Sequence, residues 1–356
     1  MPVNLLSAAA KISSFTMLSR ITGLLRETLI ARTYGASEWT DAFNVAFRIP
    51  NLLRRLFAEG AFSQAFVPVL SETNTKEGKE GTTLMVSAIA TLLFWALLAT
   101  VILGVIGAPW IIFLVASGIR ETGAHEASLT LTRIMFPYIG LISMVSLSAG
   151  ILNTYKKFAV PAFTPVLLNL SMIFSSWLLS PYFETPIYAL GIGVIVGGIT
   201  QLAIQIPALK KIGMLPRIGL GFSKINQAWN HPGAKKVLRL MLPALFGVSV
   251  AQLSLIINTN IASHLAVGSV SWLSYADRLM EFPTALLGVA IATVLLPSLS
   301  KANALEDKTQ MAQLVDWGLK LTLSWQHRQL WRYLYLVSHW LRSYITTVNL
   351  QPSTWP

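Results

Sequence analysis

Apolar residues follow one another along most of this chain in runs far longer than a soluble helix or strand needs. Each long run reaches the roughly 20 residues that an α-helix needs to cross the hydrocarbon core of a bilayer. The predicted spans are residues 5–31, 41–70, 83–115, 128–152, 158–180, 186–208, 236–263 and 270–299, and a further run begins near Met311. The pattern therefore predicts an all-α integral membrane protein, a polytopic helix bundle.

Composition supports this prediction. Hydrophobic residues make up 54% of the chain and charged residues 12%, where roughly 25% charged residues is usual for soluble proteins. The chain has no cysteine, which excludes disulfides and thiolate metal sites. No phosphate-cradling glycine loop, zinc-spaced His and Glu pair or Gly-x-Ser-x-Gly elbow occurs, so we expect a transporter without cofactor or metal, not an enzyme.

The connectors between spans alternate in charge. Basic residues gather in the connectors at 76–79, 156–157, 210–239 and 301–308, whereas those at 33–40, 181–185 and 264–269 have no Lys or Arg. Lys and Arg in short loops mark the cytoplasmic side. The net charge of +12 therefore indicates contact with anionic membrane lipid and not with nucleic acid, and we expect a multi-pass protein of the cytoplasmic (inner) membrane with a cytoplasmic N-terminus.

The spans also suggest a duplicated architecture. The second span ends in Val-Pro68-Val-Leu-Ser71 and the eighth in Leu-Pro297-Ser-Leu-Ser300, each after a charged first half. A parallel repeat of about six helices explains the likeness, although shared bilayer constraints also could. The predicted organisation is an N-terminal lobe at 1–209, a basic cytoplasmic linker at 210–235, a partial C-terminal lobe at 236–324 and an atypical tail at 325–356.

Ionisable residues occur within three spans, where each charge at mid-membrane costs roughly 2.5–3.5 kcal/mol. Structural ion pairs holding helices in register explain Glu27, Arg48, Asp277 and Glu281 as well as a binding site does. Arginine nevertheless outnumbers acid at depth, and guanidinium grips phosphate or carboxylate bidentately without losing its proton. The surplus therefore favours a cationic cavity for an anion such as pyrophosphate.

Four sequence blocks carry a family resemblance. Residues 40–68, from Thr-Asp-Ala-Phe through Ile-Pro-Asn-Leu-Leu-Arg-Arg-Leu-Phe-Ala-Glu-Gly to Val-Pro, closely resemble the second helix of the MurJ/MviN family of lipid II flippases. The same holds for Ser-Arg-Ile-Thr-Gly-Leu-Leu-Arg at 19–26, Leu-Leu-Asn-Leu-Ser at 167–171 and Ser-Tyr-Ala-Asp-Arg-Leu-Met-Glu-Phe-Pro at 274–283. The resemblance runs from the N-terminus to about Ser324.

The resemblance implies a two-lobed bundle of the multidrug/oligosaccharidyl-lipid/polysaccharide exporter superfamily, its second lobe incomplete here. Such proteins flip lipid II, an undecaprenyl-pyrophosphate-linked peptidoglycan precursor, from the inner to the outer leaflet by alternating access, for cell-wall biosynthesis. It also implies that Asp41 pairs with an arginine when the cavity is empty, and that an ion gradient or the membrane potential drives transport. The implied substrate-binding residues are Arg20, Arg26, Asp41, Arg54 and Arg278, with Asn51, Glu59 and Glu281 as neighbours.

Other functions remain open at this point. An ion-coupled drug or cation antiporter of the same superfamily should have a lone membrane carboxylate instead of an arginine surplus. A membrane enzyme acting on polyprenyl phosphate would need an acid or base free of arginine neighbours. A non-functional truncated product is the third alternative.

The tail at 325–356 differs from the rest of the chain. It contains four of the eleven tryptophans, two of the five histidines and no glycine. When Trp325 through Arg332 are back-translated and read one base out of register, the codons give small and apolar residues typical of a continuing membrane helix. We therefore expect a frameshift near Ser324, in the gene or its sequencing. The alternative is a short form with an amphipathic tail at the interface.

Overall fold

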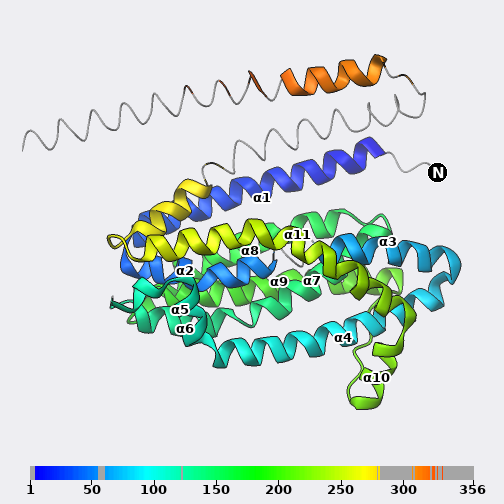
Figure 1. Cartoon of the computed structure of the whole chain (residues 1–356), viewed down its shortest axis with the longest axis horizontal. Helices are drawn as coiled ribbons and strands as arrows, with labels where there is room; N and C mark the ends of the chain where they lie inside the picture. The colour runs from blue at the N-terminus through cyan, green and yellow to red at the C-terminus, as the bar shows by residue number, and fades with distance from the viewer. Residues whose placement is uncertain are drawn as a thin grey trace, which may run out of the picture. The chain divides into compact units, whose positions relative to one another are not determined.

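The computed structural model describes residues 5–54, 61–121, 123–278, 280, 307, 309–320, 323–324, 327 and 331. All secondary structure in these residues is helical, which confirms the predicted fold class (Figure 1). The elements are α1 (Leu5–Tyr34), α2 (Glu38–Arg54), α3 (Ala61–Lys76), α4 (Gly78–Ile106), α5 (Ala108–Val115), η2 (Ser117–Glu121), α6 (His125–Met135), α7 (Tyr138–Thr154), α8 (Ala159–Leu179), η3 (Ser180–Tyr182), α9 (Tyr188–Ile212), α10 (Phe222–Asn230) and α11 (Pro232–Ser263). Residues 269–278 and 309–320 are also helical.

Met1–Arg278 form one compact unit and Leu279–Pro356 a second. Within the described residues, four helical segments are long and apolar enough to cross a membrane: Gly78–Ile106, His125–Thr154, Ala159–Tyr182 and Tyr188–Ile212. The lobe boundaries predicted from the sequence stay a prediction, and the eighth predicted span lies mostly outside the described residues, as does the tail at 325–356.

Two of the predicted spans are interrupted. The span at 83–115 divides at Gly107 into α4 and α5, and the one at 128–152 divides near Pro137 into α6 and α7. The backbone N–H of Phe136 still donates to Thr132 O (2.9 Å), and that of Leu141 to Pro137 O (3.4 Å). Proline removes a helical donor, which interrupts the helical hydrogen-bond pattern between α6 and α7, although His125–Thr154 together remain long enough to cross a membrane.

Buried apolar side chains form two large clusters. One joins α2 to α5, α6, α7, α8 and α9, and includes Phe43, Ile112 and Leu131. The other joins α3 to α4, α7, α9 and α11, and includes Phe66 and Met85. Because the clusters hold α2 and α3 against different neighbours, the two halves of the predicted second span are fixed separately.

Glycine allows α8 and α9 to pack closely. A Cβ on Gly193 would lie 2.9 Å from Met172 Cα and 3.2 Å from Ser171 O of α8, closer than packed atoms tolerate. Small residues at helix contacts let backbones approach inside membranes, where van der Waals packing drives association. This contact fixes the stretch of α8 that carries Asn169.

Candidate functional site

The side chain of Arg26 is buried between α1 and α8. Its residue is 7% exposed. One terminal nitrogen, Nη1, donates to Asn169 Oδ1 at 2.9 Å and approaches the sulfur of Met172 at 3.6 Å. A guanidinium cannot lose its proton, so a full positive charge is held inside the helix bundle by neutral partners on α8.

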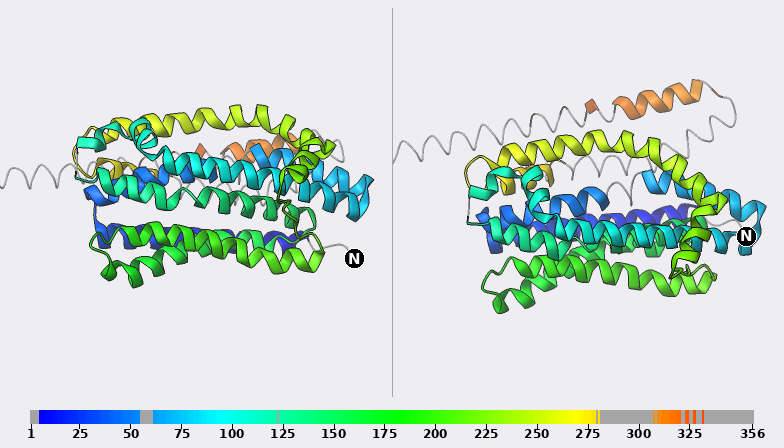
Figure 2. Two further views of the ribbon diagram at one scale, coloured as in Figure 1. Left: turned by 90° about the horizontal axis from the view of Figure 1, so that it is seen from below. Right: turned by 60° about the horizontal axis from the view of Figure 1, so that its bottom comes forward.

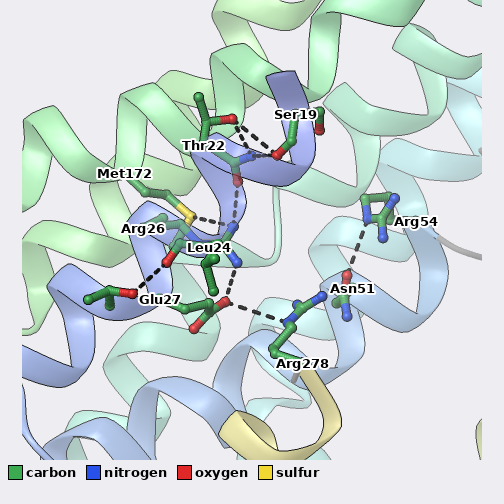
Figure 3. A network of polar contacts seen from close by, with 11 residues as sticks. Ser19, Thr22, Leu24, Arg26, Glu27, Asn51, Arg54, Met172 and Arg278 are labelled. Carbon is green, nitrogen blue, oxygen red and sulfur yellow. Dashed lines mark hydrogen bonds and ion pairs between the residues drawn. The ribbon is translucent and has the colours of Figure 1, made fainter. Parts of the chain in front are cut away.

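Glu27 links this arginine to a second one. Its Oε1 forms an ion pair with Arg26 Nη2, and the same oxygen lies 3.5 Å from Arg278 Nε (Figure 3). Arg278 lies in the helical stretch 269–278, so the cluster joins segments about 250 positions apart in the sequence. Two guanidinium groups therefore contact the same carboxylate oxygen, which brings two positive charges close together. The Arg278 side chain is 36% exposed, so an anion can reach it from outside the bundle.

Asn169 fixes the position of Arg26. Its Nδ2 donates to Ser19 O and to Thr22 Oγ1, both at 3.1 Å, while its Oδ1 accepts from Arg26. The amide therefore contacts Ser19, Thr22 and Arg26, which follow one another along α1. The sequence analysis included this residue in the block at 167–171 but gave it no role. The feature that could have identified it is a polar amide within an apolar span.

Asp41 occupies a different place. Its Oδ2 accepts from the backbone N–H of Gly268 at 2.7 Å, and its Oδ1 from the backbone N–H and hydroxyl of Ser271 at 2.7 and 2.6 Å. These donors open the helix at 269–278, so Asp41 caps a helix in sequence-distant chain. Among the described contacts no arginine partner replaces them, and the predicted Asp41–arginine pair is wrong for this conformation. Its role toward a substrate stays a prediction.

Gly268 makes this cap possible. Its φ is +95°, and a Cβ there would lie 2.8 Å from the carbonyl oxygen of Ala36. Nearby, Tyr275 donates its hydroxyl to Gly35 O at 3.2 Å. The loop between α1 and α2 thus lies directly against the loop after α11.

The remaining predicted residues have other printed contacts or lie outside the described residues. Arg54 Nε donates to Asn51 Oδ1 at 3.2 Å on the last turn of α2, and Figure 3 draws this pair together with the cluster. Arg20 lies half-buried on α1, two residues before Thr22. Glu59 and Glu281 fall outside the described residues.

Helices long enough to cross a membrane, with a buried arginine and a glutamate paired among them, describe a polytopic membrane protein that holds charge between its helices. Residues 30–325 match the family described as lipid II flippase MurJ. The chain belongs to this family, which confirms the resemblance predicted from the sequence, including the prediction of a transporter family over an enzyme.

Individual relatives give the same result. The chain is 57% identical over 321 residues to the lipid II flippase MurJ of Burkholderia cenocepacia, covering 90% of this chain and 62% of the relative. It is 44% identical over 326 residues to the probable lipid II flippase MurJ of Vibrio cholerae, covering 89% and 61%. A solved structure described as "Lipid II flippase MurJ, inward closed conformation" matches with a TM-score of 0.68 at 30% identity, over 88% of this chain and 62% of that one.

The chain spans about three-fifths of the length of the relatives it matches. The family match ends at residue 325, next to Ser324, where the resemblance predicted from sequence also ended. Family membership therefore concerns residues 30–325.

Proposed function

We propose that this chain carries the pyrophosphate-binding part of a lipid II flippase and takes part in moving lipid-linked peptidoglycan precursor across the cytoplasmic membrane. The observation that carries the proposal is the Arg26–Glu27–Arg278 cluster, in which two guanidinium groups from separate helices both contact Glu27 Oε1. Family membership supplies the substrate class, since the relatives are named lipid II flippases.

The chemistry of the cluster suits a diphosphate. Guanidinium groups donate paired N–H bonds to phosphate oxygens, and charge-assisted bonds of this type are about twice as strong as neutral ones. Glu27 keeps the two arginines together against their mutual repulsion while no ligand is bound. A diphosphate that approaches Arg278 from its exposed side takes over that role, and Glu27 is released.

Arg20, Arg54 and Asn51 extend the same cationic path in the proposal, with Glu59 and Glu281 beside it. Asp41 acts at a distance, because its cap holds the first turn of the helix that carries Arg278. In the membrane, the basic connectors face the cytoplasm, as the positive-inside rule requires. The polyprenyl tail stays in lipid beside the bundle, while an ion gradient or the membrane potential supplies the drive.

Binding of a lipid II analogue by the detergent-solubilised chain tests the proposal. Arg26→Ala and Arg278→Ala should each weaken binding about tenfold or more, since a charge-assisted hydrogen bond contributes about 1.5–3 kcal/mol. Arg32→Ala is the matched control: the same residue type on α1, exposed at its last turn, and it should bind as the parent does.

The melting temperature of each variant separates loss of binding from loss of folding. Parental affinity in both well-folded cluster variants would overturn the role of the arginines. If a variant binds the lipid II analogue weakly and no longer binds diphosphate alone, the lost contact is with the phosphates. Transport itself is measured with the same variants in vesicles, by the appearance of labelled lipid II in the outer leaflet.

A further inference from the structure

The segment between α9 and α11 extends sideways from the bundle. Figures 1 and 2 show α10 running across the direction of the long helices, beside the end at which α4 and α11 begin. Three large apolar side chains in this segment face outward: Leu220 is 75% exposed, Phe222 90% and Trp229 56%. A soluble surface would rarely present such a group together.

Helical spacing places the apolar residues of α10 on one side. Phe222, Ile225, Ala228 and Trp229 lie within one arc of the helix, and Ala228 is the buried residue that faces the bundle. Gln227 lies on the opposite, exposed side. A short helix with an apolar face, lying across the spans at their ends, is typical of an interfacial membrane helix.

Side chains of α4 form hydrogen bonds with polar backbone groups of the non-helical stretch before α10. The backbone N–H of Arg217 donates to Ser87 Oγ at 3.2 Å, and that of Gly219 to Thr91 Oγ1 at 2.9 Å. Gly219 O accepts from Trp95 Nε1 at 3.0 Å. These three partners recur every four residues along α4, a helix apolar enough to span the membrane. Irregular backbone is tolerated beside lipid only where protein groups satisfy its polar atoms.

The charge around this segment is of one sign. No Asp or Glu occurs between Thr185 and Ala276, whereas the stretch from 210 to 239 has several basic residues. Those described as exposed are Lys210, Lys211, Arg217, Lys224, Lys235, Lys236 and Arg239. Such clusters next to membrane spans attract anionic headgroups.

We propose that residues 215–230 form an anionic-phospholipid binding element, in which Leu220, Phe222 and Trp229 enter the boundary between headgroups and acyl chains. Arg217 and Lys224 contact lipid phosphates there. The element anchors the connection between α9 and α11 to the bilayer, independently of the site at Arg26. Its occupant is a lipid surface, because both the backbone pairing to α4 and the uniform positive charge fit a bilayer.

Depth measurement tests the apolar part. Because the chain has no cysteine, a single nitroxide label can be attached to Phe222→Cys or, as the matched control, to Gln227→Cys in the whole chain in nanodiscs. We expect the label at 222 to be relaxed more by oxygen than by a water-soluble nickel chelate, and the label at 227 to show the reverse. A label at 222 as accessible to nickel as that at 227 would place this side chain in water and overturn the proposal.

Lipid preference tests the charged part. Native mass spectrometry measures bound phosphatidylglycerol relative to phosphatidylcholine in the parent and in an Arg217→Gln, Lys224→Gln double variant. We expect the preference to fall by roughly tenfold, in line with the attraction of each basic residue to an anionic surface. Lys156→Gln with Lys157→Gln removes the same charge from exposed positions in another basic connector and should change it little. An equal fall in both variants would show a general charge effect and overturn the specific element.

Discussion

The role of Glu27 depends on the two arginines that it contacts. The sequence left it between a structural ion pair and a site residue, and the structure places it between Arg26 and Arg278. The structure therefore shows it as an ion-pair partner of both arginines, and the proposed function makes it part of the site as well. Sequence reasoning identified all three residues, but it could not pair them, because 251 positions separate Glu27 from Arg278 and nothing in a single sequence encodes that contact.

Asp41 is the second residue whose role depends on distant chain. Asp41→Ala removes three acceptor contacts from Gly268 and Ser271, and hydrogen bonds to a charged group contribute about 1.5–3 kcal/mol each. We expect the amide hydrogens of 268–274 to exchange at least tenfold faster in this variant, measured by mass spectrometry in detergent.

Asp41→Asn provides the graded comparison. The asparagine keeps one acceptor oxygen but places an amide donor opposite a backbone N–H. The amide hydrogens of 268–274 should therefore exchange at a rate between those of the parent and Asp41→Ala. Unchanged protection at 268–271 in both variants would contradict the capping role.

At the scale of elements, periodicity located the helices well. Seven of the predicted spans contain described helices close to their expected bounds. An apolar run of membrane length has few stable conformations other than a helix. The interruptions at Gly107 and near Pro137 were less predictable, since glycine and proline also occur inside continuous membrane helices. The helix at 222–230 was missed because it is short and lies in what reads as a basic linker.

The close packing of α8 on α9 gives a prediction at this scale. Gly193→Ala places a methyl group 2.9 Å from Met172 Cα, and such overpacking typically costs about 1–3 kcal/mol. We expect a lower melting temperature in detergent and, since Asn169 lies one turn before Met172 on α8, weaker binding at Arg26.

Gly140→Ala is the control in α7. Its Cβ would meet only Val101 Cγ2, at 3.9 Å, an ordinary contact, and alanine is the better helix former. This variant should melt at or above the parental temperature. If the two variants melt alike, packing at Gly193 is looser than the structure indicates.

At the scale of the whole molecule, α3 and α11 join the predicted N-terminal lobe to the start of the second. Lys236 lies 2.5 Å from Glu72 Oε2, and Lys76 lies 2.8 Å from Oε1. Hydrogen bonds and charge from Lys236, with those from Lys76, lower the pKa of Glu72 from 4.5 to about 2. This carboxylate is exposed, so its contribution is modest and weakens with salt.

The lowered pKa sets the pH window for this contact. Because the pKa in the folded state lies below the ordinary value, the stabilisation is complete above pH 4.5 and is lost as the pH falls toward about 2. We expect Glu72→Gln to melt below the parent at pH 7, with the difference shrinking from pH 4.5 downward. Melting curves across that range at low and high salt measure it. A difference that is independent of pH would point to packing instead of charge.

The arginine cluster has an electrical consequence. The diphosphate of the proposed function would bring two negative charges to these arginines. The loaded and the empty site would then differ by two charges in their response to a transmembrane voltage, at about 2.3 kcal/mol per charge for each 100 mV crossed. The voltage dependence of each step of the proposed transport would therefore show whether the site moves with or without its lipid.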